Sequence, residues 1–101
     1  MRYRLKSNLS KTAVYRAVCA HNTSGVELPP IRQCQFRKVR HAYWLSFPGY
    51  EVLFCQWDGD IRFKVDAISY DEELRCIAST EICKIIPFDY CLQNNLLREV
   101  A

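Results

Sequence analysis

The chain has 101 residues, with 14 Lys and Arg against 11 Asp and Glu and a formal net charge of +3. A chain of this length buries roughly two thirds of its unfolded surface, so it forms one core, and we expect a single domain over residues 1–101. Half of the residues are apolar and a quarter are charged, which excludes a disordered chain and a low-complexity fibre.

Neither a membrane span nor an export signal is expected. No apolar stretch approaches the about 18 residues that a transmembrane helix needs. The N-terminal sequence MRYRLKSNLSK is charged but has no hydrophobic segment and no small-residue cleavage site after it. We therefore expect a cytoplasmic protein with no membrane partner.

The N-terminal part predicts a short strand and then a helix. Apolar and charged residues alternate over 2–6, as in a strand. Apolar residues at helical spacing predict an α-helix over 9–21, which Ser7 or Ser10 can cap. The two prolines at 29–30 mark a connector.

The middle of the chain predicts three strands. Residues 36–47 alternate and indicate one strand, which the Pro-Gly pair at 48–49 ends. Residues 50–57 and 61–67 flank Asp-Gly-Asp at 58–60, a sequence typical of a tight hairpin turn. The first strand of this hairpin is apolar on both faces, so it should be central in the sheet.

The segment 70–82 fits two structures. Ser69 and Glu72 could form a capping box at the start of a helix, but the alternation of apolar residues in the segment favours a strand. In that interpretation 71–73 form a turn, and 82–86 continue as a strand up to a proline.

The C-terminus predicts a helix, which Asp89 can cap and whose apolar stripe is Leu92, Leu96, Leu97 and Val100. The expected fold is α+β, an antiparallel sheet of about four to five strands with an N-terminal and a C-terminal helix.

Six cysteines occur in the chain, and without export we expect them to be reduced. They are Cys19, Cys34, Cys55, Cys76, Cys83 and Cys91. Several lie in apolar segments and should pack as small buried thiols. No C-x-x-C pair is present, so we expect no metal and no cofactor. The spacing leaves open whether Cys19, His21 and Cys34, or the series from Cys76 to Cys91, hold a metal.

Charge is unevenly distributed along the chain. Residues 1–50 hold nine Lys or Arg and one Glu, a net charge of +8, whereas residues 51–101 hold five against ten acids, a net charge of −5. Clustered cations are typical of proteins with a polyanionic partner. The cations could equally pair with the acidic second half in the folded sheet, and we favour this pairing because it is the commoner fate of surface Lys and Arg.

Basic and aromatic residues are densest around residues 36–44. The candidate partner-binding residues are Arg32, Arg37, Lys38, Arg40, His41, Tyr43 and Trp44. Aromatic and Arg side chains dominate binding energy at protein interfaces, and the same combination suits single-stranded nucleic acid. No glycine-rich phosphate loop or nucleophile motif is present, so no catalytic residue is assigned.

One local pattern has a known counterpart. The stretch from Tyr43 to Phe54, followed by the Trp-Asp-Gly-Asp sequence at 57–60 and by Val65, resembles the central hairpin of HigB/RelE-type ribosome-dependent ribonuclease toxins. The resemblance covers about a third of the chain. This chain has Glu51 where that family usually has an Arg, and more than thirty residues follow Val65 where the family usually ends.

These observations favour a small non-enzymatic binding protein that acts on a protein partner, such as a phage or mobile-element inhibitor of a host nucleic-acid-processing protein. Two alternatives stay open. The resemblance implies a ribonuclease toxin that would use Arg37, Lys38, Arg40 and His41 to bind and cleave messenger RNA on ribosomes. The basic half alone would suit a single-stranded nucleic-acid-binding module.

Overall fold

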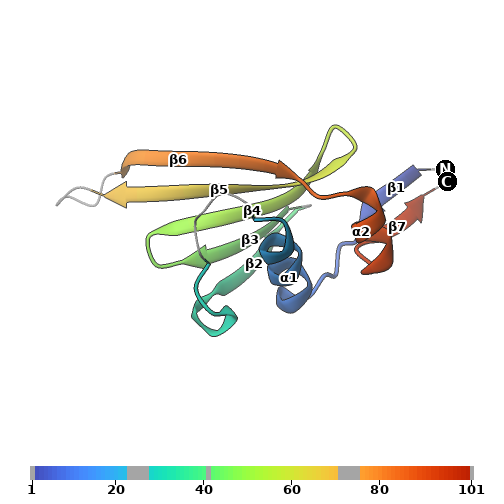
Figure 1. Ribbon diagram of the computed structural model, residues 1–101, viewed down its shortest axis with the longest axis horizontal. Coiled ribbons are helices and arrows are strands. Elements are labelled where there is room, and N and C mark those ends of the chain that lie inside the picture. Colours follow the sequence, from blue (N-terminus) through green and yellow to red (C-terminus); the bar gives the residue numbers. More distant parts are fainter. Residues whose placement is uncertain (1, 23–27, 41, 71–75, 101) are drawn as a thin grey trace.

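The computed structural model describes residues 2–22, 28–40, 42–70 and 76–100. Its central element is a five-stranded antiparallel sheet in the order β2-β3-β4-β5-β6. The strands are β2 (Gln35–Val39), β3 (Ala42–Phe47), β4 (Tyr50–Trp57), β5 (Asp60–Tyr70) and β6 (Cys76–Ile85). Together with two α-helices this sheet confirms the α+β class (Figure 1).

The hairpin between β4 and β5 has the turn that its sequence predicts. Asp58 and Gly59 both have positive φ, 51° and 84°, which matches the right-handed twist of the flanking strands. The strand β4 is the third of five, so its central position is confirmed.

The prediction of one strand over 36–47 is wrong. The segment forms two strands, β2 and β3, which pair with each other from Gln35 opposite Ser46 to Val39 opposite Ala42. The chain reverses at Arg40, whose φ is 57°. No Gly or Pro lies next to Arg40, so the sequence contains no residue that would have predicted this turn.

The strand interpretation of the segment after β5 is confirmed from residue 76 onward. The strand β6 pairs with β5 from Tyr70 opposite Cys76 to Arg62 opposite Ile85, with an irregularity at Ser69 and Tyr70. The predicted turn at 71–73 lies outside the described residues.

The first helix, α1 (Lys11–His21), begins where Ser10 caps it, because the Ser10 hydroxyl accepts a hydrogen bond from the Ala13 amide at 3.1 Å. Its buried residues are Val14, Ala17 and Val18, and they pack against one face of the sheet. The helix predicted over 9–21 is confirmed from Lys11 to His21, and Leu9 precedes it. A short 3₁₀ helix, η1 (Ile31–Gln33), follows the two prolines.

The predicted C-terminal helix is only partly present. The helix α2 (Phe88–Gln93) begins after Pro87, so Asp89 lies in its first turn and does not cap it. Asn95, whose φ is 58°, follows the end of α2 and has the left-handed conformation that commonly ends a helix. The last residues form a strand, β7 (Leu97–Val100), instead of a helix.

The strand β7 pairs antiparallel with the N-terminal strand β1 (Arg2–Leu5), from Arg2 opposite Val100 to Leu5 opposite Leu97. The two chain ends therefore lie side by side at one end of the molecule (Figure 1). This second, two-stranded sheet was not expected, although the strand over residues 2–5 itself is confirmed.

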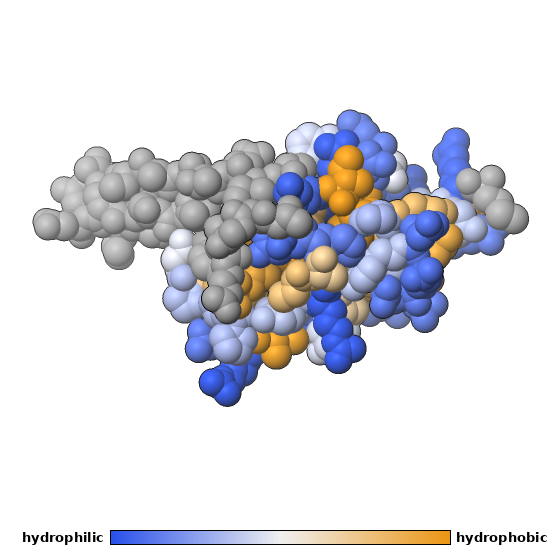
Figure 2. Space-filling view, in the orientation of Figure 1, coloured by the Kyte–Doolittle hydropathy of each residue, from blue (hydrophilic) through white to orange (hydrophobic). Residues whose placement is uncertain are grey.

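One core contains described residues of both α-helices and of every strand except β6. The fully buried larger side chains are Tyr43, Phe54, Phe63, Leu45, Ile86, Leu96, Val14, Val18, Val52 and Cys91. On the side of the molecule that α1 covers, hydrophilic side chains predominate, with an apolar patch near the point where β6 leads into α2 (Figure 2). Ile85 and Phe88, which stand in that part of the chain, are each about half exposed. Within the described residues, no helix is long and apolar enough to cross a bilayer.

Candidate functional site

The sheet has one face packed against the helices and one that no described helix covers. The inner face supplies core residues from β3, β4 and β5, and the buried residues of α1 and α2 belong to the same core. Side chains alternate along a strand, so the residues between those core positions point to the opposite side. We call this opposite side the open face. Its described side chains are Gln35, Arg37, Val39, Ala42, Trp44, Ser46, Glu51, Leu53, Cys55, Trp57, Asp60, Arg62, Lys64 and Ile85.

A continuous row of side chains crosses four strands of the open face. Arg37 is directly opposite Trp44, Trp44 is opposite Leu53, and Leu53 is opposite Lys64. Trp57 lies two strand positions beyond Cys55 on the same face and is 55% exposed. Both tryptophans of the chain are therefore on the open face.

The Arg37 side chain is held in place on this face. Its guanidinium carbon lies 5.2 Å from the centroid of the Trp44 ring, in a cation–π arrangement. Its Nη2 is 3.8 Å from Oε1 of Glu51, and the same oxygen accepts a hydrogen bond from the Ser46 hydroxyl at 3.2 Å. Arg37 and Trp44 together therefore present a cationic group and an aromatic ring on the paired strands β2 and β3.

The expected role of Tyr43 in partner binding is corrected by its burial. Tyr43 is 1% exposed, and its ring stacks on Phe36 and meets Phe54 edge-on. Its hydroxyl donates a hydrogen bond to the Lys6 carbonyl oxygen and accepts one from the Leu9 amide at 3.1 Å. Tyr43 is thus a core residue that ties the segment before α1 to the sheet.

The remaining predicted residues do not form one cationic surface. Lys38 is opposite Tyr43, so it belongs to the inner side at the exposed edge strand, while Arg37 belongs to the open face. Arg40 is exposed in the turn after β2, and Arg32 is exposed in η1. His41 lies outside the described residues.

Charge pairing between the two halves of the sequence occurs at Arg37 and Glu51. Arg62 and Asp60 also form an ion pair, at 3.2 Å, which is local to the β4–β5 turn. Basic residues of the first half that lie elsewhere are not neutralised in this way by described acids. Arg2 and Arg4 are two such residues, and they lie beside Arg98 of the second half.

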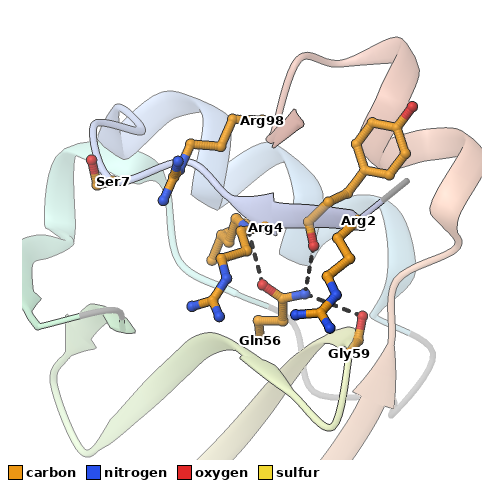
Figure 3. Close-up of a pocket in the computed structure, with 8 residues that line it drawn as sticks. Arg2, Arg4, Ser7, Gln56, Gly59 and Arg98 are labelled. Atoms are coloured by element: carbon orange, nitrogen blue, oxygen red, sulfur yellow. Dashed lines mark hydrogen bonds between the residues drawn. The ribbon is translucent and has the colours of Figure 1, made fainter. Parts of the chain in front are cut away.

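These arginines line a second feature, which sequence reasoning missed. Arg2 and Arg4 from β1 and Arg98 from β7 surround a hollow of about 730 Å³ between the two-stranded sheet and the β4–β5 turn (Figure 3). We call it the arginine hollow. The alternation of Arg2 and Arg4 was visible in the sequence, but Arg98 was assigned to a helix and so could not be placed beside them.

Cys19, Cys34, Cys55 and Cys91 are free thiols. Cys34 and Cys91 are buried. The expectation that cysteines in apolar segments are buried is wrong for Cys19, which is exposed, and for Cys55, which is only half-buried. Burial raises the pKa of the Cys91 thiol from 9.0 to about 11, and burial likewise raises that of Cys34. Within the described part of the chain, no three or more His, Cys, Asp or Glu side chains are grouped so that they could hold a metal ion.

Comparisons with protein-family models, with curated proteins and with solved structures find no match for the chain.

Proposed function

We propose that the protein is a non-enzymatic binding protein and that the open face is where it binds a protein partner. The observation that carries the proposal is the position of both tryptophans, Trp44 and Trp57, on a sheet face that no described helix covers. A sheet buries one face in its own core, and an apolar and aromatic second face gains free energy when another protein covers it.

The composition of the open face favours a protein over a nucleic acid. Arg37 is paired with Glu51, and Arg62 with Asp60, so acids partly neutralise the cations on this side. A nucleic-acid surface needs unpaired cations to meet phosphates, whereas protein interfaces combine Trp and Arg anchors with balanced charge. The finer form of the proposal is that the protein inhibits a nucleic-acid-processing protein by covering part of its surface.

Affinity purification from the native cells tests this proposal, with the tagged wild type compared with Trp44→Ala and Trp57→Ala. Leu92→Ala is the matched control, because Leu92 is an exposed apolar residue on α2, 41% exposed and away from the open face. We expect one protein that the wild type and Leu92→Ala retain after nuclease treatment and that both Trp variants lose.

Two results would contradict the proposal. A partner that all three variants retain equally would place the interface elsewhere. Capture that disappears on nuclease treatment would indicate a nucleic-acid partner. Growth arrest on expression with cleavage of ribosome-bound messenger RNA would instead support the ribonuclease alternative.

A further inference from the structure

The arginine hollow concentrates positive charge without an acidic counterpart. Besides Arg2, Arg4 and Arg98, its lining contains Ser7 and Gln56 and no Asp or Glu. Among the described residues, none of the three guanidinium groups has an ion pair or hydrogen bond. The hollow is half open to solvent, and all three arginines are exposed and accessible to a ligand.

The strand register makes this arrangement unfavourable for an empty protein. Arg4 and Arg98 are directly opposite each other in the β1–β7 pair, and like charges in that position destabilise a sheet. Arg2 adds a third cation on the same side of β1, two residues along the strand. An anion bound between them would relieve the repulsion.

The backbone that carries the arginines is fixed by a partly buried polar side chain, Gln56. Gln56 accepts a hydrogen bond from the Leu5 amide at 3.0 Å through Oε1. Its Nε2 donates to the carbonyl oxygens of Tyr3 at 3.1 Å and Gly59 at 3.3 Å. Figure 3 shows these bonds on the side of β1 toward which Arg2 and Arg4 extend. The hollow is therefore built before any ligand arrives.

We propose that the arginine hollow binds a ligand that carries two or more phosphate groups. Guanidinium groups match phosphate oxygens with paired, charge-assisted hydrogen bonds, and three of them exceed what a single phosphate can neutralise. By strand alternation the Tyr3 ring lies on the other side of β1, where it packs edge-on against Phe88. The site thus recognises phosphates without stacking on a base. It does not depend on the proposed function, because none of the residues that line the hollow belongs to the open face.

Calorimetric titration with two probes tests the proposal and separates the sources of such a ligand. Inorganic triphosphate represents a small polyphosphate, and a short single-stranded RNA represents a phosphodiester chain. The double variant R4Q/R98Q should weaken binding of the effective probe by about a hundredfold, tenfold for each arginine removed. The matched control R32Q/K38Q loses the same charge elsewhere and should bind like the wild type.

Binding of triphosphate alone would assign the site to small polyphosphates, and tighter binding of RNA that weakens steeply with salt would assign it to a nucleic-acid backbone. Failure of the wild type to bind either probe would overturn the proposal. Equal weakening in R4Q/R98Q and R32Q/K38Q would also overturn it, because only the net charge would then matter.

A stability measurement keeps the test independent of misfolding. Arg98→Glu places a carboxylate opposite Arg4, so the free protein should have a higher Tm than the wild type while losing the ligand. A lower Tm together with unchanged binding would contradict both the repulsion and the site.

Discussion

The Arg37 guanidinium lies over the indole ring of Trp44, 5.2 Å from its centroid, and the two residues face each other directly across the β2–β3 pair. Arg37 comes from the edge strand of the sheet and is 57% exposed in its side chain. The relationship fixes a charged, planar group over an aromatic ring on a face that no described helix covers. It makes this pair the centre of the proposed binding surface.

The contact itself should be measurable in stability. A double-mutant cycle with Arg37→Ala and Trp44→Ala should give a coupling free energy of about 0.5–1 kcal/mol, the value usual for exposed cation–π pairs. Urea unfolding of the four proteins provides it. The cycle with Arg32→Ala in place of Arg37→Ala should show no coupling. Additive effects in the first cycle would contradict the geometry.

The hydroxyl of Tyr43 should matter to the fold and not to a partner. Tyr43→Phe leaves the Lys6 carbonyl and the Leu9 amide without their partner, which should cost about 1–3 kcal/mol in the free energy of unfolding. The control is Tyr3→Phe, because the Tyr3 hydroxyl has no hydrogen-bond partner among the described residues, so this variant should unfold like the wild type. Equal stability of the two variants would show that the Tyr43 hydroxyl has no structural role.

A side chain at Gly59, in the turn between β4 and β5, should lower the stability of the protein only because of the backbone conformation there. Gly59 has φ of 84° and open space where a Cβ would lie. Gly59→Ala should therefore destabilise the protein by about 1–2 kcal/mol through backbone strain and not through a clash. Arg40→Gly, at φ of 57°, should relieve strain and leave the thermal midpoint unchanged or raised. A loss of stability in Arg40→Gly would contradict this account of the turns.

Stability should fall at alkaline pH because of Cys91. Its pKa is about 11 in the folded protein and 9.0 ordinarily, so between these values the unfolded chain has lost a proton that the native state retains. The contribution of Cys91 to the free energy of unfolding is therefore complete below pH 9.0, and it is lost as the pH rises toward 11. Burial raises the pKa of Tyr90 in the same direction.

The measurement is urea unfolding across this pH range for the wild type and for Cys91→Ala. The variant should be less stable at neutral pH but should lose less stability on the way to alkaline pH. Cys19→Ala serves as the control, since Cys19 is exposed and the slope should match that of the wild type. Parallel curves for wild type and Cys91→Ala would refute the assignment.

Local signals predicted what local interactions decide. The Asp58-Gly59 turn, the α1 stripe with its Ser10 cap and the central position of β4 follow from short stretches of sequence. The burial of Tyr43 could also have been predicted, because Tyr43 alternates with Leu45 and Phe47 along the strand. Its position beside basic residues led instead to its interpretation as a binding residue. The same alternation now places Trp44 on the open face.

Long-range pairing explains what the sequence did not predict. Leu96, Leu97 and Val100 have a spacing that suits a helix, but β7 gains its hydrogen bonds from β1, at the other end of the chain. A partner that distant leaves no trace in a local pattern. Trp57 was assigned to a strand buried on both faces, and only the register with β5 shows that its side is open.

Site-specific photo-crosslinking tests the central claim most directly. A benzoylphenylalanine residue at position 57 reports on the open face, and the same residue at position 92 reports on α2, both being exposed positions. The account predicts a crosslinked protein partner from position 57 in native cells and none from position 92, with the product unaffected by nuclease. Crosslinking from position 92 alone, or to nucleic acid alone from position 57, would contradict it.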